Sequence, residues 1–210
     1  MNNNQKDMII DVPYCSQIDE IHKNGVEKAW ANQSCGIISL KMVLDFFLKE
    51  QIDIKELLDK GLEMGAFIED VGWSHIGLVN LASEYGLYAW RRRFYLNDGD
   101  KSIFEKEGVG DPSLKIFDEQ LENEGIFSIR DSIRKKCPVI ISIPKNFEIG
   151  EHGHLVVVTG VKVSNLDTMD IEGFYVNDPY NPDGEDRKGE FVNLEKFKNW
   201  NKRALFFRYL

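Results

Sequence analysis

The sequence has few cysteines and no long apolar segment, and both shortages exclude classes of protein. Its three cysteines, Cys15, Cys35 and Cys137, are an odd number without the paired spacing of zinc ligands. This pattern argues against a disulfide framework and a structural metal site, and it fits a reducing compartment. No apolar run is long enough to span a bilayer, and residues 1–11 lack the apolar core of a signal peptide. We therefore expect no membrane span and a cytoplasmic location, with secretion still open if a signal segment had been removed.

The chain also has fewer basic residues than acidic ones. The chain has 26 Lys and Arg against 35 Asp and Glu, which gives a formal charge of -9 at pH 7. Nucleic acids and anionic lipids attract clustered cations, so we expect neither a nucleic-acid partner nor a membrane-surface partner. One basic run, Arg91–Arg93, is short, and we interpret it as a solvated strand edge.

The length and composition fit one well-packed domain over residues 1–210. Of its 210 residues, 42% are hydrophobic, which is enough for one sizeable core. Residues 97–124 are acidic and weakly periodic, and they predict an insertion or long loop with at most a short helix. This stretch is either a lid or a solvated excursion. The oligomeric state is left open.

Helical patterns occupy the first half of the chain. The segment Cys35–Lys49 is apolar on most sides, which predicts a buried core helix with Ser34 as its capping residue. A second helix follows Asp53, and a third begins near Ser74 and ends before Gly86. We expect residues 16–33 to be irregular.

Strand patterns dominate the second half, after a short helix predicted over residues 128–136. The predicted strands are rich in Val, Ile, Phe and Tyr and cover Val139–Ile143, Leu155–Val163, Phe174–Val176 and Leu205–Tyr209. Helices that come first and strands that come later predict an α+β fold, in which an antiparallel sheet packs on a helical lobe. A cleft between the two parts is a natural binding site.

Cys35 is the first candidate for chemistry because it stands at the start of the core helix. Free N–H groups and the helix dipole at this position favour a thiolate, which is the nucleophilic form of cysteine. The alternative is a small buried side chain that only packs.

A nucleophilic cysteine needs a base, which is normally a histidine held in place by a third group. His22 and His75 have sufficient roles in capping or packing. His152 and His154 lie in "EHGHLVVVTGV" and share one face of an extended segment, so they are a conceivable metal pair, although no further ligand completes it. His154 opens a strand and is the stronger candidate base.

Asp178 is the candidate for the third group. It ends the strand in "FYVNDPYNP", where Asp-Pro is by itself only a turn signal. Adjacent antiparallel strands bring the end of one strand beside the start of the other, so Asp178 can accept from one nitrogen of His154 while the second nitrogen faces Cys35.

Four blocks of the sequence resemble those of one family in the same order: "DVPYCSQ", "SCGIISLKMVLDFF", "GHLVVVTGV" and "FYVNDPY", with "CPVIISIP" before the third. The chain is similar to the cysteine peptidase family 39-like proteins, which are relatives of the peptidases that cut double-glycine leaders from bacteriocins. The resemblance implies a bacterial thiol protease with a papain-like fold, a nucleophile on the central helix, and a histidine and an aspartate on the sheet.

Carried over by position, the resemblance makes Cys35 the nucleophile, His154 the general base and acid, Asp178 the residue that orients the imidazole, and Gln17 an oxyanion-hole donor. Gln33, which is nearer to Cys35 in the sequence, is the alternative donor. "CGII" lacks the proline that commonly follows Cys-Gly in this family. Trp30, Trp73 and Tyr180 are candidates for cleft walls, and equally for core or rim residues.

The resulting hypothesis is a cysteine peptidase or amide hydrolase that acts on a peptide or protein through an acyl-enzyme, without metal or organic cofactor. One alternative is a catalytically silent peptide-binding module on the same fold. Another is an acyl transferase, in which an amine replaces water as the acceptor.

Overall fold

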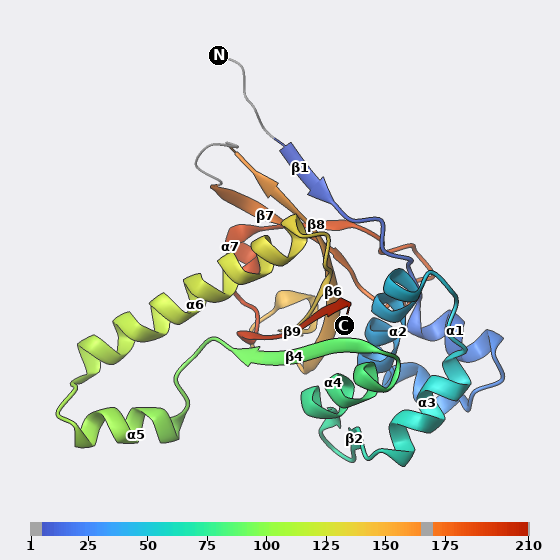
Figure 1. Ribbon diagram of the computed structural model, residues 1–210, viewed down its shortest axis with the longest axis horizontal. Helices are drawn as coiled ribbons and strands as arrows, with labels where there is room; N and C mark the ends of the chain where they lie inside the picture. The colour runs from blue at the N-terminus through green and yellow to red at the C-terminus, as the bar shows by residue number, and fades with distance from the viewer. Residues whose placement is uncertain (1–5, 165–169, 210) are drawn as a thin grey trace.

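The computed structural model describes residues 6–164 and 170–209. Its centre is a seven-stranded antiparallel sheet with the path β4-β9-β5-β6-β7-β8 and with β1 beside β6 (Figure 1). The strands are β1 (Lys6–Ile9), β4 (Leu87–Arg93), β5 (Val139–Pro144), β6 (Gly153–Val163), β7 (Ile171–Asn177), β8 (Glu190–Asn193) and β9 (Arg203–Tyr209). β1 and β9 come from opposite ends of the chain and join this one sheet. The single domain over residues 1–210 stays a prediction.

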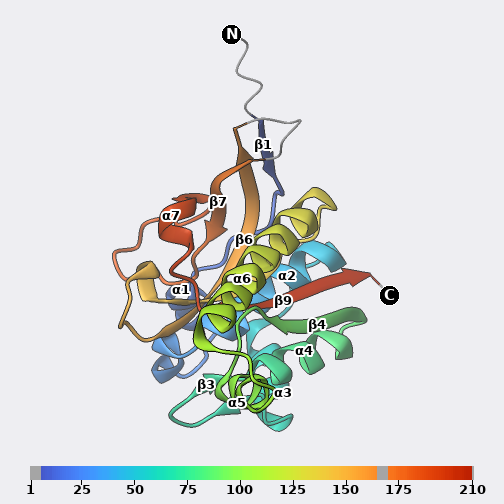
Figure 2. The ribbon, with the colours of Figure 1, turned by 90° about the vertical axis from the view of Figure 1, so that its left-hand side faces the viewer.

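Helices cover both faces of this sheet. The core helix α2 (Cys35–Leu48) packs on β6 and β5, and the end of α6 (Asp111–Arg134) packs on β1, β5 and β6 from the other face (Figures 1 and 2). Because both faces are covered, every residue of β5 is buried, and so are most residues of β6. This explains why these strands read as continuous apolar runs rather than as alternating ones.

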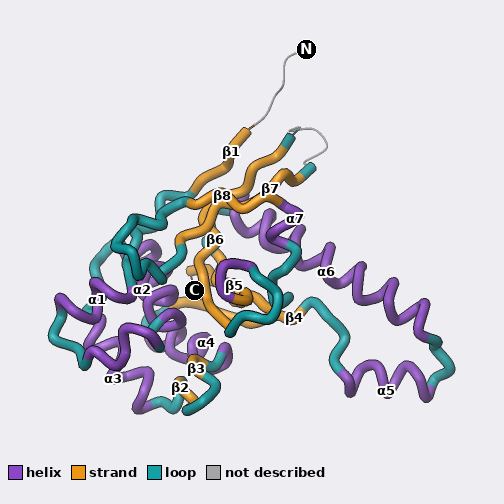
Figure 3. The backbone as a smooth tube through the Cα atoms, turned by 180° about the vertical axis from the view of Figure 1, so that it is seen from behind, coloured by secondary structure: helices purple, strands orange, loops and turns teal. Residues whose placement is uncertain are grey.

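A helical lobe lies against α2. It contains α1 (Gln17–Lys23), α3 (Ile54–Glu63) and α4 (His75–Glu84), with a small hairpin of β2 (Phe67–Ile68) and β3 (Gly72–Trp73) (Figure 3). The remaining short helices are η1 (Lys28–Asn32), η2 (Lys145–Phe147) and α7 (Leu194–Phe197). The predicted α+β fold, with a helical lobe on an antiparallel sheet, is therefore confirmed.

Residues 16–33 are more ordered than the sequence suggested, because they contain α1 and η1. The Ser16 side chain accepts from the Asp19 N–H at 3.1 Å and caps α1. Ser34 stands at the N-cap of α2, but its side chain makes no capping hydrogen bond. It is separated from the short helix η1 by Gln33 alone, and its φ and ψ of -95° and 8° are not the extended conformation of a capping residue.

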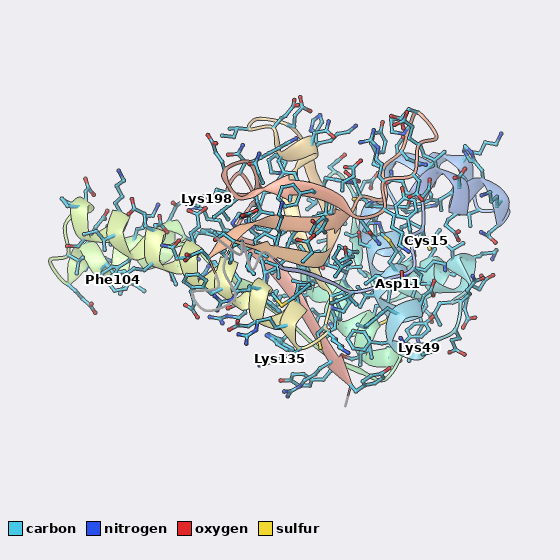
Figure 4. All side chains as sticks on the ribbon, turned by 90° about the horizontal axis from the view of Figure 1, so that it is seen from above. Asp11, Cys15, Lys49, Phe104, Lys135 and Lys198 are labelled. Carbon is cyan, nitrogen blue, oxygen red and sulfur yellow. The ribbon has the colours of Figure 1, made fainter. Side chains whose placement is uncertain are left out.

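The interpretation of residues 97–124 as a long loop is wrong. The stretch forms α5 (Asp98–Lys106) and the first half of α6, which also absorbs the short helix predicted over residues 128–136. Its apolar stripe is short, because α5 packs on the first half of α6: Leu114 is buried and the Phe104 and Phe117 rings lie 5.7 Å apart, so helical periodicity gave only a weak signal. Whether it is an insertion relative to the family stays a prediction. We call residues 97–124 the arm, which projects from the body with Phe104 far from the sheet (Figures 3 and 4).

Gly125 marks the point where α6 reaches the body. A Cβ at this position would lie 2.7 Å from Phe94 and 2.8 Å from Trp200, so only glycine allows the helix to approach these two rings so closely. Beyond Gly125, the buried side chains of Ile126, Ile129 and Ile133 attach the helix to the sheet.

Candidate active site

Cys35 is the first residue of α2, and its side chain is partly buried at the positive end of the helix. The first N–H groups of a helix have no partner within the helix, so they face whatever lies at its start. The Gly36 that follows has no room for a side chain, because a Cβ would lie 2.5 Å from Cβ of Trp73. The start of α2 is therefore pressed against the β2–β3 hairpin, which fixes the position of the thiol.

His154 lies at the start of β6 and is only 7% exposed. Its Nε2 is 2.6 Å from Oδ1 of Asp178, and the imidazole lies close enough to Cys35 to lower the pKa of the thiol. Since Nε2 is occupied by the carboxylate, Nδ1 is the ring nitrogen that remains for the thiol. The structure thus brings Cys35, His154 and Asp178 together from α2, β6 and the end of β7.

Asp178 is itself held by several hydrogen bonds. Its Oδ1 accepts from the Tyr180 N–H at 2.8 Å, and its backbone N–H donates to the Arg187 carbonyl at 3.2 Å. Its carbonyl accepts from the Tyr14 hydroxyl at 3.0 Å. Such contacts restrict the carboxylate to one orientation toward the imidazole. Sequence reasoning found Asp178 but missed Tyr14, which lies in "DVPYCSQ" far away along the chain.

The electrostatics of the cluster favour a thiolate beside an imidazolium. Burial by itself would raise the pKa of the Cys35 thiol, but the hydrogen bond and charge of His154 outweigh burial and lower that pKa. Backbone N–H groups of Leu155 and Gly36 act in the same direction. For His154, burial opposes the charged form, but hydrogen bonds to Asp178 and Cys35 outweigh it and raise the pKa to about 10.

The pKa values of the other two cysteines are shifted in the opposite direction. Burial raises the pKa of Cys15 to about 12, even though Lys41 acts against this rise. Burial also raises the pKa of Cys137. Among the cysteines, all of which lie in the described part of the chain, Cys35 alone combines a lowered pKa with a histidine partner.

Gln17 is the first residue of α1 and is 1% exposed. Its Nε2 donates to the Ala31 carbonyl at 2.6 Å, and its backbone N–H donates to the Pro179 carbonyl at 2.7 Å. Gln17 therefore connects the start of α1 to the turn that carries Asp178, but it is not among the residues that line the cleft. Gln33, the alternative donor, does line it.

The cleft beside Cys35 has a volume of about 1100 Å³. Phe67, Trp73 and Tyr95 contribute aromatic walls, whereas Trp30 and Tyr180 do not line it. Trp30 instead packs edge-on against Phe67, with ring centroids 5.0 Å apart. The cleft is lined by Asn32, Gln33, Cys35, Phe67, Asp70, Val71, Gly72, Trp73, Ser74, His75, Arg91, Arg92, Arg93, Tyr95, Ser142, His152, Gly153, His154, Leu155, Asn201 and Arg203.

The interpretation of Arg91–Arg93 as a merely solvated strand edge is incomplete. β4 is an edge strand and the three arginines are exposed, but they also line the cleft. Sequence reasoning missed this because Arg203, from the other end of the chain, pairs with Arg93 across β4 and β9. Only the pairing of β4 with β9 shows that these four arginines line the same cleft.

The remaining histidines lie apart from this cluster. His22 is exposed on α1, and His152 is exposed at the rim of the cleft. His75 lines the cleft, where burial, Arg203 and Arg91 lower its pKa to about 4. Within residues 6–164 and 170–209, no three His, Cys, Asp or Glu side chains are grouped as a metal site would need. In the same described part, no helix is long and apolar enough to cross a membrane.

Comparison with protein families gives a match over nearly the whole chain. The model of the Peptidase_C39 like family matches residues 9–204. The chain belongs to this family. The resemblance read from the four sequence blocks is thereby confirmed, and family membership supports a cysteine-peptidase-like function. No curated protein matches the chain.

Solved structures of the family share the fold. A C39-like peptidase from Bacillus anthracis is 16% identical with a TM-score of 0.58, and the match covers 96% of this chain and 98% of that one. A double-glycine-motif protease from an AMS/PCAT transporter, in complex with the leader peptide, is 19% identical with a TM-score of 0.52 and coverages of 96% and 94%. At these identities the likeness establishes the papain-like fold.

Proposed function

We propose that this protein is a cysteine peptidase in which Cys35, His154 and Asp178 form the catalytic triad. The observation that carries the proposal is the buried 2.6 Å contact between His154 and Asp178, with the same imidazole beside a thiol at a helix N-terminus and lowering its pKa. A peptide substrate is supported by the family and by the relative described in complex with a leader peptide. The cytoplasmic location stays a prediction.

The first half of the reaction follows from these positions. The Cys35 thiolate attacks the carbonyl carbon of the scissile peptide bond, and negative charge develops on the carbonyl oxygen. The Cys35 N–H at the start of α2 donates to that oxygen, and a glutamine side chain is the second donor: Gln17 by the family's pattern, or Gln33, which lines the cleft. The Gln17 amide nitrogen has a second hydrogen, and one donor of this type contributes a few kcal/mol to such a step. His154 then protonates the leaving amine, which gives a thioester on Cys35.

The second half regenerates the enzyme. Water attacks the thioester carbonyl while His154 accepts a proton from it, and the acid product leaves as the thiolate returns. Asp178 keeps the imidazole in the tautomer and orientation that both steps require. In an acyl transferase an amine would take the place of this water.

Product analysis of a synthetic peptide library tests the proposal. The purified chain is incubated with the library in the presence and absence of an added primary amine, and products are identified by mass spectrometry. We expect hydrolysis products in both conditions and none with Cys35→Ser. Amide products in large excess would indicate the acyl transferase. An unreacted library together with retained peptide binding would indicate the silent binding module.

A further inference from the structure

The cleft has a charge opposite to that of the whole chain. The formal charge of the protein is -9, yet four arginines, Arg91, Arg92, Arg93 and Arg203, line the cleft. Asp70 is the only carboxylate residue among the lining residues, all of which lie in the described part of the chain. A locally positive cleft in an acidic protein points to the charge of whatever binds there.

Two of these arginines are neutralised from outside the cleft. Arg92 pairs with Glu124 at 2.6 Å and Arg93 pairs with Asp100 at 2.8 Å, and both carboxylates come from the arm. Arg91 and Arg203 form no ion pair with any carboxylate of residues 6–164 and 170–209.

The Arg203 guanidinium is held in place without losing its charge. Its Nη2 and Nε donate to the Tyr95 hydroxyl at 2.7 and 3.1 Å. A phenol hydroxyl that accepts hydrogen bonds orients the guanidinium fork but does not neutralise it. The remaining N–H groups can therefore bind a carboxylate in a charge-assisted contact.

Strand register gives the spacing between the backbone at Arg203 and the start of β6. Arg203 pairs with Ser142 across β9 and β5, and Ser142 pairs with Leu155 across β5 and β6. Leu155 directly follows His154. Two strand spacings are about 10 Å, and an extended peptide covers that distance in about three residues.

His75 lines the same cleft, and the charges of Arg203 and Arg91 act on it. His75 is partly buried, and burial is the main cause that lowers its pKa to about 4. The charges of Arg203 and Arg91 add to this effect. His75 is therefore neutral at pH 7 and does not compete with the arginines for a carboxylate.

We propose that the cleft selects peptides with an acidic side chain about three residues from the scissile bond, and that Arg203 and Arg91 bind this side chain. The inference rests on the proposed peptidase function, and it defines the substrate class of that site. Either glutamate or aspartate can supply the carboxylate. The side of the scissile bond on which this residue lies is determined by moving it along the peptide.

A cleavage experiment uses one internally quenched peptide that the enzyme cuts. Glutamate is placed at each position up to five residues on either side of the bond, and glutamine at the same positions serves as the neutral control. We expect kcat/KM to be about tenfold higher with glutamate than with glutamine at one position, which corresponds to one charge-assisted contact. Added salt should reduce this ratio.

Matched variants connect the ratio to the arginines. Arg203→Gln should reduce the Glu/Gln ratio to about twofold or less. Arg208→Gln makes the same charge change on β9 but outside the cleft, where Arg208 lies 4.5 Å over the Tyr88 ring, and should leave the ratio unchanged. Arg203→Glu should instead favour a peptide with lysine at that position. Equal ratios in wild type and Arg203→Gln would overturn the inference.

Measuring peptide binding to the inactive Cys35→Ala variant separates this inference from the proposed function. Fluorescence anisotropy with labelled Glu and Gln peptides needs no turnover. A preference for the Glu peptide that Arg203→Gln removes would support the acidic-ligand cleft even if no peptide were cleaved. Cleavage without any preference for glutamate would overturn the inference and leave the peptidase function standing.

Discussion

The site and the arm hold their polar groups in opposite ways. His154 and Asp178 are each 7% exposed, and their 2.6 Å contact is sheltered by α2 and by the turn after β7. In α5, by contrast, no residue is buried. The arm depends on surface contacts such as Arg93–Asp100 and on the capping box of Asn97 and Asp100.

This contrast shows what each region requires. A buried polar group is costly unless it is paired, so the geometry of the site is strongly constrained. Exposed ion pairs contribute little, typically below about 1 kcal/mol each, so the arm tolerates change. Substitutions in the site should therefore affect activity strongly, while changes in the arm should affect it little.

The largest effect is expected at the nucleophile and its base. Cys35→Ala and His154→Ala should each lower kcat/KM by about 10⁴-fold or more, because no second group can replace either role. Peptide cleavage measures the loss, and thermal unfolding checks that the fold persists. His152→Ala is the matched control and should retain activity. Loss of activity in His152→Ala together with retained activity in His154→Ala would show that His152, and not His154, is the base.

A smaller loss is expected from Asp178→Ala, of about 10²-fold to 10³-fold, since an unoriented imidazole still accepts a proton part of the time. Asp178 is one of the groups that raise the pKa of His154, so removing it should lower that pKa from about 10. The alkaline limit of the pH–rate profile should then move to lower pH. A variant with wild-type rate and an unchanged profile would remove Asp178 from the triad.

The oxyanion donor should contribute less again. Gln17→Glu keeps the size of the side chain but loses the amide donor, including its hydrogen bond to the Ala31 carbonyl. We expect kcat to fall by about 10²-fold, with thermal unfolding as the check that the fold persists. Gln33→Glu, the matched change at the alternative donor, should lower kcat less. The reverse order in steady-state kinetics would assign the oxyanion contact to Gln33.

The smallest effect is expected from the arm. The Leu96 N–H donates to Asp118 Oδ1 at 2.6 Å, so residues 96 and 118 are close enough to be joined by a short Gly-Ser linker in place of residues 97–117. Cleavage of a neutral peptide should stay within about twofold, and the free energy of unfolding should fall by about 1 kcal/mol. A loss of activity as large as that of Asp178→Ala would mean that the arm takes part in catalysis.

The sequence predicted the buried parts of the fold better than its surface. The apolar runs of β5 and β6 and the apolar helix α2 were recognisable because burial on all sides leaves a compositional pattern. The neighbourhood of His154 and Asp178 was expected from antiparallel pairing of their two strands, and the family resemblance supplied their roles. The first half of α6 lies in the arm and has only a short apolar stripe, so it was predicted as a loop.

Features that join distant segments were the hardest to predict. The contact between the Tyr14 hydroxyl and the Asp178 carbonyl crosses most of the chain. The pairing of Arg93 with Arg203 depends on how β4 and β9 meet. Neither has a local signal, so the substrate-facing surface emerges only from the folded structure.

The most direct test of the central claim is the alkylation rate of each cysteine by iodoacetamide as a function of pH, followed by peptide mass mapping. The lowered pKa of Cys35 predicts fast reaction that persists below neutral pH, while Cys15, with its pKa near 12, and Cys137 react slowly. In His154→Ala the advantage of Cys35 should disappear. Reaction of Cys35 only in alkali, or no faster than at the other two cysteines, would contradict the account.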